Sequence, residues 1–172
     1  MHLFLLLLSL NAAPRELDLK TLLQRAPIVL LAEVADPRNQ VIDLPLGDKV
    51  FQRLRRQFRL VEVLRGNASR TPLPQVLAVD EPRWQAQYRA ALMCQKSRKC
   101  KDVVVDRYRG TLAKEPVPGA KVLLFLKRNA LGELELAADQ AMEAETALAS
   151  VRARLHARAQ RPGQAVQQGK QP

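Results

Sequence analysis

Three segments of the chain place their apolar residues on one face of a helix. The first, residues 16–26, is ended by Pro27 and has apolar residues at i, i+3, i+4 and i+7: Leu19, Leu22, Leu23 and Ala26. The second, residues 82–93, starts at a proline that the first helical position tolerates and gathers on one side Trp84, Tyr88, Ala91 and Leu92. The third, residues 139–158, starts with Asp139 as a helix cap and repeats apolar residues at steps of 4, 3 and 4: Ala144, Leu148, Val151 and Leu155.

Other segments have the pattern of β-strands. Residues 28–34 form a near-continuous apolar run with β-branched residues, which is typical of a buried strand. Residues 49–65 predict either one long strand or two strands that meet at a bulge. Shorter strands are predicted at residues 75–80, 103–105, 121–127 and 133–138. A turn joins the last two as a hairpin, so the strands are expected to run mostly antiparallel. Residues 36–48, with two prolines, an asparagine and a glycine, predict a loop.

The N-terminus has the form of a secretory signal peptide. Residues 3–10 read LFLLLLSL and precede the small residues Ala12 and Ala13, and the apolar part of such a signal needs only about 7–15 residues. We expect residues 1–13 to be the signal and the protein to be exported. A buried N-terminal segment or a misassigned start codon would give the same run.

Composition describes a small basic domain. The chain has 172 residues, with 28 Lys and Arg against 17 Asp and Glu and a formal net charge of +11. With 47% hydrophobic residues it can bury a core, which argues against global disorder. No apolar run reaches the roughly 18–20 residues that a membrane span needs. Two histidines and two cysteines are too few for most zinc, haem and iron–sulfur sites, so no cofactor or metal is predicted.

Cys94 and Cys100 are predicted to form a disulfide, because export places them in an oxidising compartment. Five residues separate them, so they are not a redox CxxC pair, and a metal would need ligands that the chain lacks. Two unlinked thiols are the alternative.

Candidate catalytic groups are few. His156, the only histidine left after removal of the signal, stands near the end of a predicted helix, where a solvated side chain is typical. No serine stands in a nucleophile-elbow context, and the seven glycines are scattered and form no phosphate-binding loop.

Two pairs of carboxylates are candidates for an acid and a base. Asp80 and Glu81 close a strand before a proline, the usual place of solvated turn residues. Asp102 and Asp106 flank a short strand at even spacing, which predicts one exposed face. Neither pair favours catalysis, and we predict a protein that is not an enzyme.

Positive charge is the remaining signal, and it is clustered. Residues 89–101 hold five cations and no acid, which we predict to form a partner-binding patch: Arg89, Lys96, Arg98, Lys99 and Lys101. Residues 152–170 also hold five cations and no acid, and a third cluster comprises Arg53, Arg55, Arg56 and Arg59. Such local excess attracts nucleic acid, anionic lipid or acidic glycan. A merely solvated arginine-rich surface is the alternative.

The order of segments RAPIVLLAEV, FRLVEVLRG and PGAKVLLFLKR resembles bacterial exported proteins whose domain is similar to tissue inhibitors of metalloproteinases. The matching positions are Ala26 with residues 28–34, residues 63–66 (VLRG), and Gly119 with residues 122–126. The likeness covers residues 17–138, interrupted at residues 81–112. It implies a small antiparallel Greek-key barrel of the OB type, mainly β with flanking helices. The inhibitors bind the protease zinc through an N-terminal cysteine, and no cysteine precedes Cys94 here.

The expected organisation is a signal peptide (1–13), a barrel domain (14–138) that contains a helix and Cys-loop insertion (81–112), a closing amphipathic helix (139–160) and a disordered tail (161–172). The expected function is that of an exported, monomeric, bacterial binding module without cofactor, which meets an anionic or protein partner. An OB-type nucleic-acid-binding protein is the alternative, because such barrels bind single strands through basic grooves. An inhibitor-like protein is a weaker one.

Overall fold

The computed structural model describes residues 15–46, 49–66, 73–97, 104–110, 112 and 116–159. The expected signal peptide and tail lie outside these residues. No helix in the described part of the chain is long and apolar enough to cross a membrane.

Five strands close into a ring. Their order is β2 (Ile28–Leu46), β3 (Lys49–Arg65), β4 (Val76–Asp80), β7 (Leu134–Leu136) and β6 (Lys121–Arg128), and β6 pairs again with β2. The β4–β7 pair is parallel and the other four pairs of the ring are antiparallel, which confirms a mostly antiparallel sheet. A sixth strand, β8 (Met142–Ala144), pairs with β6. The short strands β1 (Glu16–Leu17) and β5 (Arg107–Tyr108) form a separate parallel pair.

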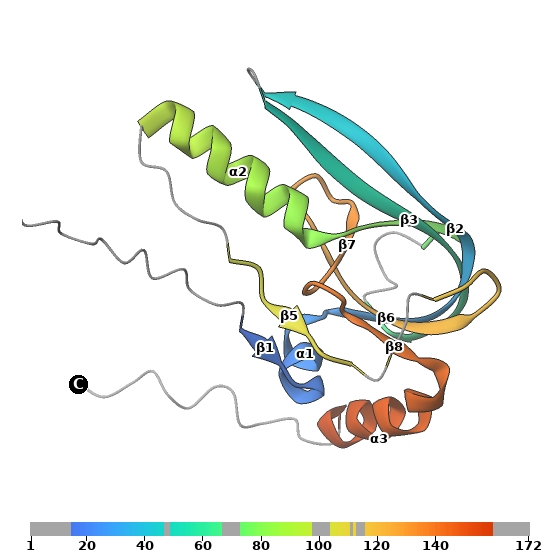
Figure 1. Cartoon of the computed structure of the whole chain (residues 1–172). Coiled ribbons are helices and arrows are strands. Elements are labelled where there is room, and N and C mark those ends of the chain that lie inside the picture. Colours follow the sequence, from blue (N-terminus) through green and yellow to red (C-terminus); the bar gives the residue numbers. More distant parts are fainter. Residues whose placement is uncertain are drawn as a thin grey trace, which may run out of the picture.

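β2 and β3 are the longest strands and extend as a curved hairpin beyond the rest of the ring (Figure 1). The segment 49–65 is therefore one strand, and the expected loop at residues 36–48 is wrong for residues 36–46. The pairing with β3 shifts register at Asp36 and Gln40 and then continues from Gln40 to Leu46. Irregularities of this kind let a strand carry residues such as Pro37 without ending.

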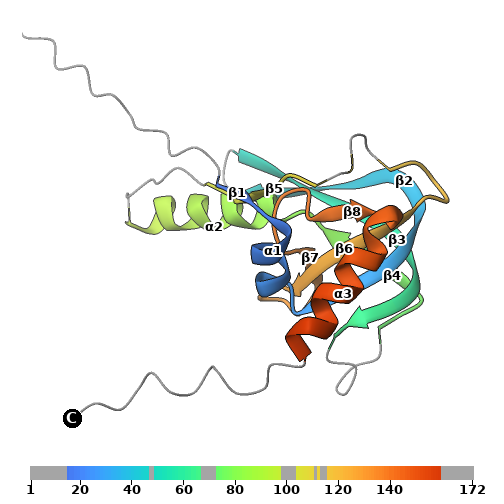
Figure 2. The same ribbon diagram turned by 90° about the horizontal axis from the view of Figure 1, so that it is seen from below.

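Three helices flank the ring: α1 (Leu19–Arg25), α2 (Pro82–Ser97) and α3 (Leu148–Ala159). α1 starts later than its pattern suggested, because Asp18 caps it by accepting a hydrogen bond from the Thr21 N–H at 2.7 Å. α2 lies beside the β2–β3 hairpin, and α3 lies near α1 on the other side of the molecule (Figures 1 and 2).

Two expected elements need correction. The closing helix begins at Leu148 and not at Asp139, because residues 142–144 add to the edge of β6 as β8 and a turn of 3₁₀ helix, Glu145–Ala147, precedes α3. Residues 104–106 are not in a strand, and the extended pairing in that segment is β5 at Arg107–Tyr108. Residue 103 lies outside the described part.

The core fills the ring and the space under α1 and α3. Its largest fully buried side chains include Phe58 of β3, Phe125 of β6, Leu22 of α1 and Val151 of α3. Leu148 and Leu155 pack against this core while remaining partly exposed. The apolar stripe of the C-terminal helix therefore faces inward, as its spacing predicted.

Candidate functional site

The cluster of arginines on β3 is neutralised by carboxylates. The side chains of Arg53 and Arg55 both bond to Asp80, the last residue of β4, with Arg53 Nε at 3.0 Å from Oδ2 and Arg55 Nε at 2.8 Å from Oδ1. Both also pair with Glu133, just before β7, and Arg55 Nη2 lies 2.9 Å from its Oε1. The guanidinium of Arg53 lies over the ring of Trp84, 4.8 Å from its centre.

Asp80 is fully buried, so its interpretation as a solvated turn residue is wrong. Burial raises the pKa of its carboxyl group, and the positive charge of Arg55 opposes that rise. Strand register explains the contact, because Asp80 of β4 pairs with Arg55 of β3 and their side chains therefore lie on the same face of the sheet.

The other two arginines of this cluster are also paired. Arg56 Nη2 lies 3.0 Å from Glu81 Oε1, and Arg59 Nη1 lies 2.9 Å from Glu33 Oε1. The β3 cluster thus joins strands to one another and offers little net charge to a partner.

The predicted partner-binding patch lies partly within the described residues. Arg89 and Lys96 are exposed on α2, and Cys94 is half-buried on the same helix. Arg98, Lys99, Cys100 and Lys101 lie outside the described part, so the disulfide and the rest of the patch remain predictions.

Arg89 borders a pocket of about 220 Å³ between α2, the segment 104–106 and strands β6 and β7. Two further cations line it, Arg25 from the end of α1 and Lys127 from β6, together with the carboxylates of Asp106 and Glu135. We call this the α2 pocket. The chain leaves α2 at Ser97 and enters the pocket wall at Val104, so the basic Cys loop connects two of its walls.

Ion pairs hold two sides of the α2 pocket. Arg25 pairs with Asp106, and Lys127 Nζ lies 3.1 Å from Oε1 of Glu135. Glu135 is buried, and its other carboxylate oxygen has no hydrogen-bond partner in the described structure. Three cations and two carboxylates line the pocket, so it offers charged N–H donors to an anionic or hydrogen-bonding group.

Sequence reasoning missed Arg25 and Lys127. Arg25 stands at the end of a helix and Lys127, next to Arg128, at the end of a strand, and only the tertiary fold brings them beside Arg89. Asp106, one of the candidate acid–base residues, pairs with Arg25, and its companion Asp102 lies outside the described part.

The described cations of the cluster at residues 152–170 lie on α3, which is on the other side of the molecule from α2 (Figure 1). Arg152 pairs with Glu62 of β3 at 2.6 Å, while Arg154 and Arg158 line a groove between α3 and α1. His156 is exposed on the same helix, as its position predicted. Among the described residues, the cations of the three basic clusters therefore do not meet in one groove.

The structure also contains a buried polar pair that the sequence pattern did not predict. The hydroxyl of Tyr108 donates a hydrogen bond to Oε1 of Glu143, and both side chains are buried. Burial, and then the carboxylate of Glu143, raises the pKa of Tyr108 well above its usual value. Such a phenol holds its proton and suits a structural role.

No group of three or more His, Cys, Asp or Glu side chains that could hold a metal occurs among the described residues. No protein-family model matches the chain, and no curated protein matches it.

Proposed function

We propose that this chain is an exported binding module, built on an inhibitor-like OB barrel, whose α2 face binds an acidic group of a partner protein or another anionic partner. The observation that carries this proposal is the convergence of Arg89, Arg25 and Lys127 from three separate elements on one pocket. The expected export, disulfide and basic Cys loop are parts of the same proposal.

The strand arrangement supports the barrel assignment. Five strands that close on themselves, with a single parallel pair between the third and the last in sequence, resemble a Greek-key OB barrel. A helix between the third and fourth ring strands, here α2, also agrees with that architecture. An inhibitor-like fold does not by itself imply inhibition, and the missing N-terminal cysteine argues against the zinc-binding mechanism.

A non-enzymatic role agrees with the state of the candidate catalytic groups. Asp80 forms ion pairs with two arginines, and Asp106 forms an ion pair with Arg25. His156 is exposed to solvent near the end of α3.

The test is direct binding of a fluorescent polyglutamate peptide to the oxidised mature protein at two salt concentrations. We expect binding that weakens severalfold in the double variant Arg89→Gln/Lys96→Gln, because both exposed cations of α2 in the predicted patch are removed. Arg83→Gln is the matched control, since Arg83 is exposed on the same helix but does not line the pocket.

Two outcomes would overturn the proposal: no binding of the acidic peptide, or an equal loss of peptide affinity in Arg83→Gln and in the double variant.

The alternative function, nucleic-acid binding, would give a different result. A single-stranded oligonucleotide that binds better than the peptide, with a steep linear dependence of log K on log salt, would indicate an OB-type nucleic-acid-binding protein.

The contribution of the Cys loop is measured separately. Intact mass with and without reductant reports whether Cys94 and Cys100 are linked in exported material, and peptide binding by Cys94→Ser/Cys100→Ser reports whether the link matters. Two alkylatable thiols in exported protein would contradict the disulfide.

A further inference from the structure

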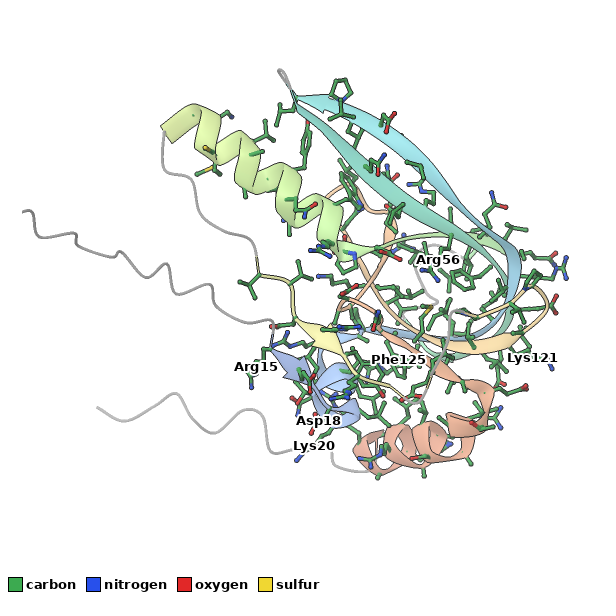
Figure 3. All side chains as sticks on the ribbon, viewed as in Figure 1. Arg15, Asp18, Lys20, Arg56, Lys121 and Phe125 are labelled. Carbon is green, nitrogen blue, oxygen red and sulfur yellow. The ribbon has the colours of Figure 1, made fainter. Side chains whose placement is uncertain are left out.

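A second basic surface lies between two helices. α1 and α3 lie side by side (Figure 2). A groove of about 450 Å³ is lined by residues of both helices. Its lining is Lys20, Leu23 and Gln24 from α1 and Arg154, Ala157 and Arg158 from α3. Figure 3 shows Lys20 on α1 near α3. A volume of this size is within the range of small-molecule sites.

The cations of this groove have no ion-pair partner in the described part of the chain. Lys20, Arg154 and Arg158 make no salt bridge there, whereas Arg152 on the same helix pairs with Glu62. Asp18 lies near enough for the charges of Lys20 and Arg154 to help lower its pKa, after its bonds to Thr21, but it makes no ion pair with either.

Two guanidinium groups meet at the end of α1 without an acid between them. Arg158 Nη1 lies 3.2 Å from the carbonyl oxygen of Leu23, and Arg65 Nη2 lies 2.8 Å from the same oxygen. Burial lowers the pKa of Arg65, and the positive charge of Arg158 lowers it further. Like charges held this close destabilise each other, and an anion beside them would relieve the repulsion.

We propose that the α1–α3 groove is a binding site for a tetrahedral oxyanion, the phosphate or sulfate group of a small ester. Arg154 and Arg158 supply forked N–H donors of the kind that match such groups, Lys20 adds a third charge, and Gln24 adds a neutral donor. Leu23 and Ala157 give an apolar contact for the organic part of the ester. The site is separate from the α2 pocket and does not depend on the function proposed there.

The experiment is titration of the full mature protein with inorganic phosphate, sulfate and acetate at constant ionic strength, followed by calorimetry and by thermal unfolding. We expect phosphate, sulfate or both to bind saturably and raise the Tm, and acetate to have no such effect. Lys20→Gln and Arg154→Gln should each weaken the Kd about tenfold or more, as loss of a charge-assisted hydrogen bond does.

Arg152→Gln and Arg83→Gln are the controls. Arg152 lies on the same helix but pairs with Glu62, and Arg83 is exposed on α2 outside the α2 pocket, so both variants should bind phosphate like the unaltered protein. Arg158 is left intact, because it also bonds to the end of α1. Tighter binding of phosphate than of sulfate would identify phosphate esters as the ligand class. Tighter binding of sulfate would identify sulfate esters. Equal responses to all three anions, or equal affinity in Arg154→Gln, would overturn the proposal.

Discussion

Gly110 occupies a place that no larger residue fits. A Cβ atom added there would stand 2.7 Å from a ring carbon of Tyr108 and 2.9 Å from the carbonyl oxygen of Met142. Both neighbours are fixed, because Tyr108 is buried and bonded to Glu143 and the second atom is backbone. The absence of a side chain at this position thus protects the buried tyrosine–glutamate pair.

We predict that Gly110→Ala destabilises the protein by about 1–3 kcal/mol, as overpacking of a core does. Gly66→Ala is the matched control, because its added Cβ would meet only Val63 and Ile28 side chains at 3.5 Å or more. Urea unfolding monitored by circular dichroism measures both. Similar unfolding midpoints for the two variants would show that the structure accommodates a methyl group at residue 110.

Asp18 supplies a second prediction at this scale, in the dependence of stability on pH. Its hydrogen bonds to Thr21 lower the pKa of the carboxyl group below the usual 3.8. The charged form therefore favours the folded state above that pH, and its contribution is lost as the pH falls through the lowered value. Asp18→Ala should lower the Tm at pH 7, and the difference from the unaltered protein should shrink below about pH 3. A difference that is constant across this range would contradict the capping role.

At the scale of elements, α3 is held by one fully buried residue. Val151 is completely buried, whereas Leu148 and Leu155 beside it retain some exposure. We predict that Val151→Ala costs roughly 2 kcal/mol of unfolding free energy, from the lost apolar contact and the cavity left behind. His156→Ala, an exposed position on the same helix, should cost less than about 0.5 kcal/mol. Equal, small losses in chemical denaturation would mean that α3 is detached from the ring.

The elements whose apolar pattern is self-contained could be predicted from the sequence. The apolar residues of the runs 28–34 and 121–127 are buried within β2 and β6. The spacing of the apolar residues in α3 predicts which face of that helix packs on the core. The elements that depend on a distant partner could not. Residues 142–144 look like the start of a helix, but they extend along β6 because its edge is open beside them.

Residues 36–46 illustrate the same limit. Proline and asparagine in this segment are turn signals when considered locally, and the pairing with β3 outweighs them. Propensity acts over a few residues, while β2 and β3 pair on both sides of the irregularity between Asp36 and Gln40.

At the scale of the whole molecule, buried charges connect three parts of the ring. Arg53 and Arg55 of β3 hold Asp80 of β4 and Glu133 at the start of β7, across the one parallel pair of the ring. The side chain of Arg53 is 11% exposed and that of Asp80 is 0% exposed, so neither is well screened by water. Loss of Asp80 would leave two arginines with only Glu133.

We predict that Asp80→Ala destabilises the fold by about 3–5 kcal/mol, the usual result of breaking a buried ion pair from one side. Arg59→Ala removes the ion pair with Glu33, in which the arginine is 61% exposed, and should cost less than about 1 kcal/mol. Comparison of denaturant midpoints checks the pair of variants. Losses of the same size would mean that the network is as weak as a surface pair.

The candidate site could be predicted only in part, because most of its residues are far apart in the sequence. The cations of α2 follow one another closely in the sequence, so Arg89 and Lys96 could be singled out. Arg25 and Lys127 of the α2 pocket, and Lys20 with Arg154 of the α1–α3 groove, come together only through tertiary packing. Counting charges along the sequence shows where cations are frequent, but a binding site needs cations that the fold brings close together in space.

The closure of β2 against β6 has a consequence for the newly made protein. Residues 28–33 are among the first of the ring to be synthesised, and their partners, residues 121–126, are among the last. Until those partners emerge, one edge of an apolar strand has no neighbour, and pairing across so long a stretch of chain is slow. A chain that stops before β6 would expose that edge and associate with other chains. The ring therefore cannot close until the last third of the chain has been made.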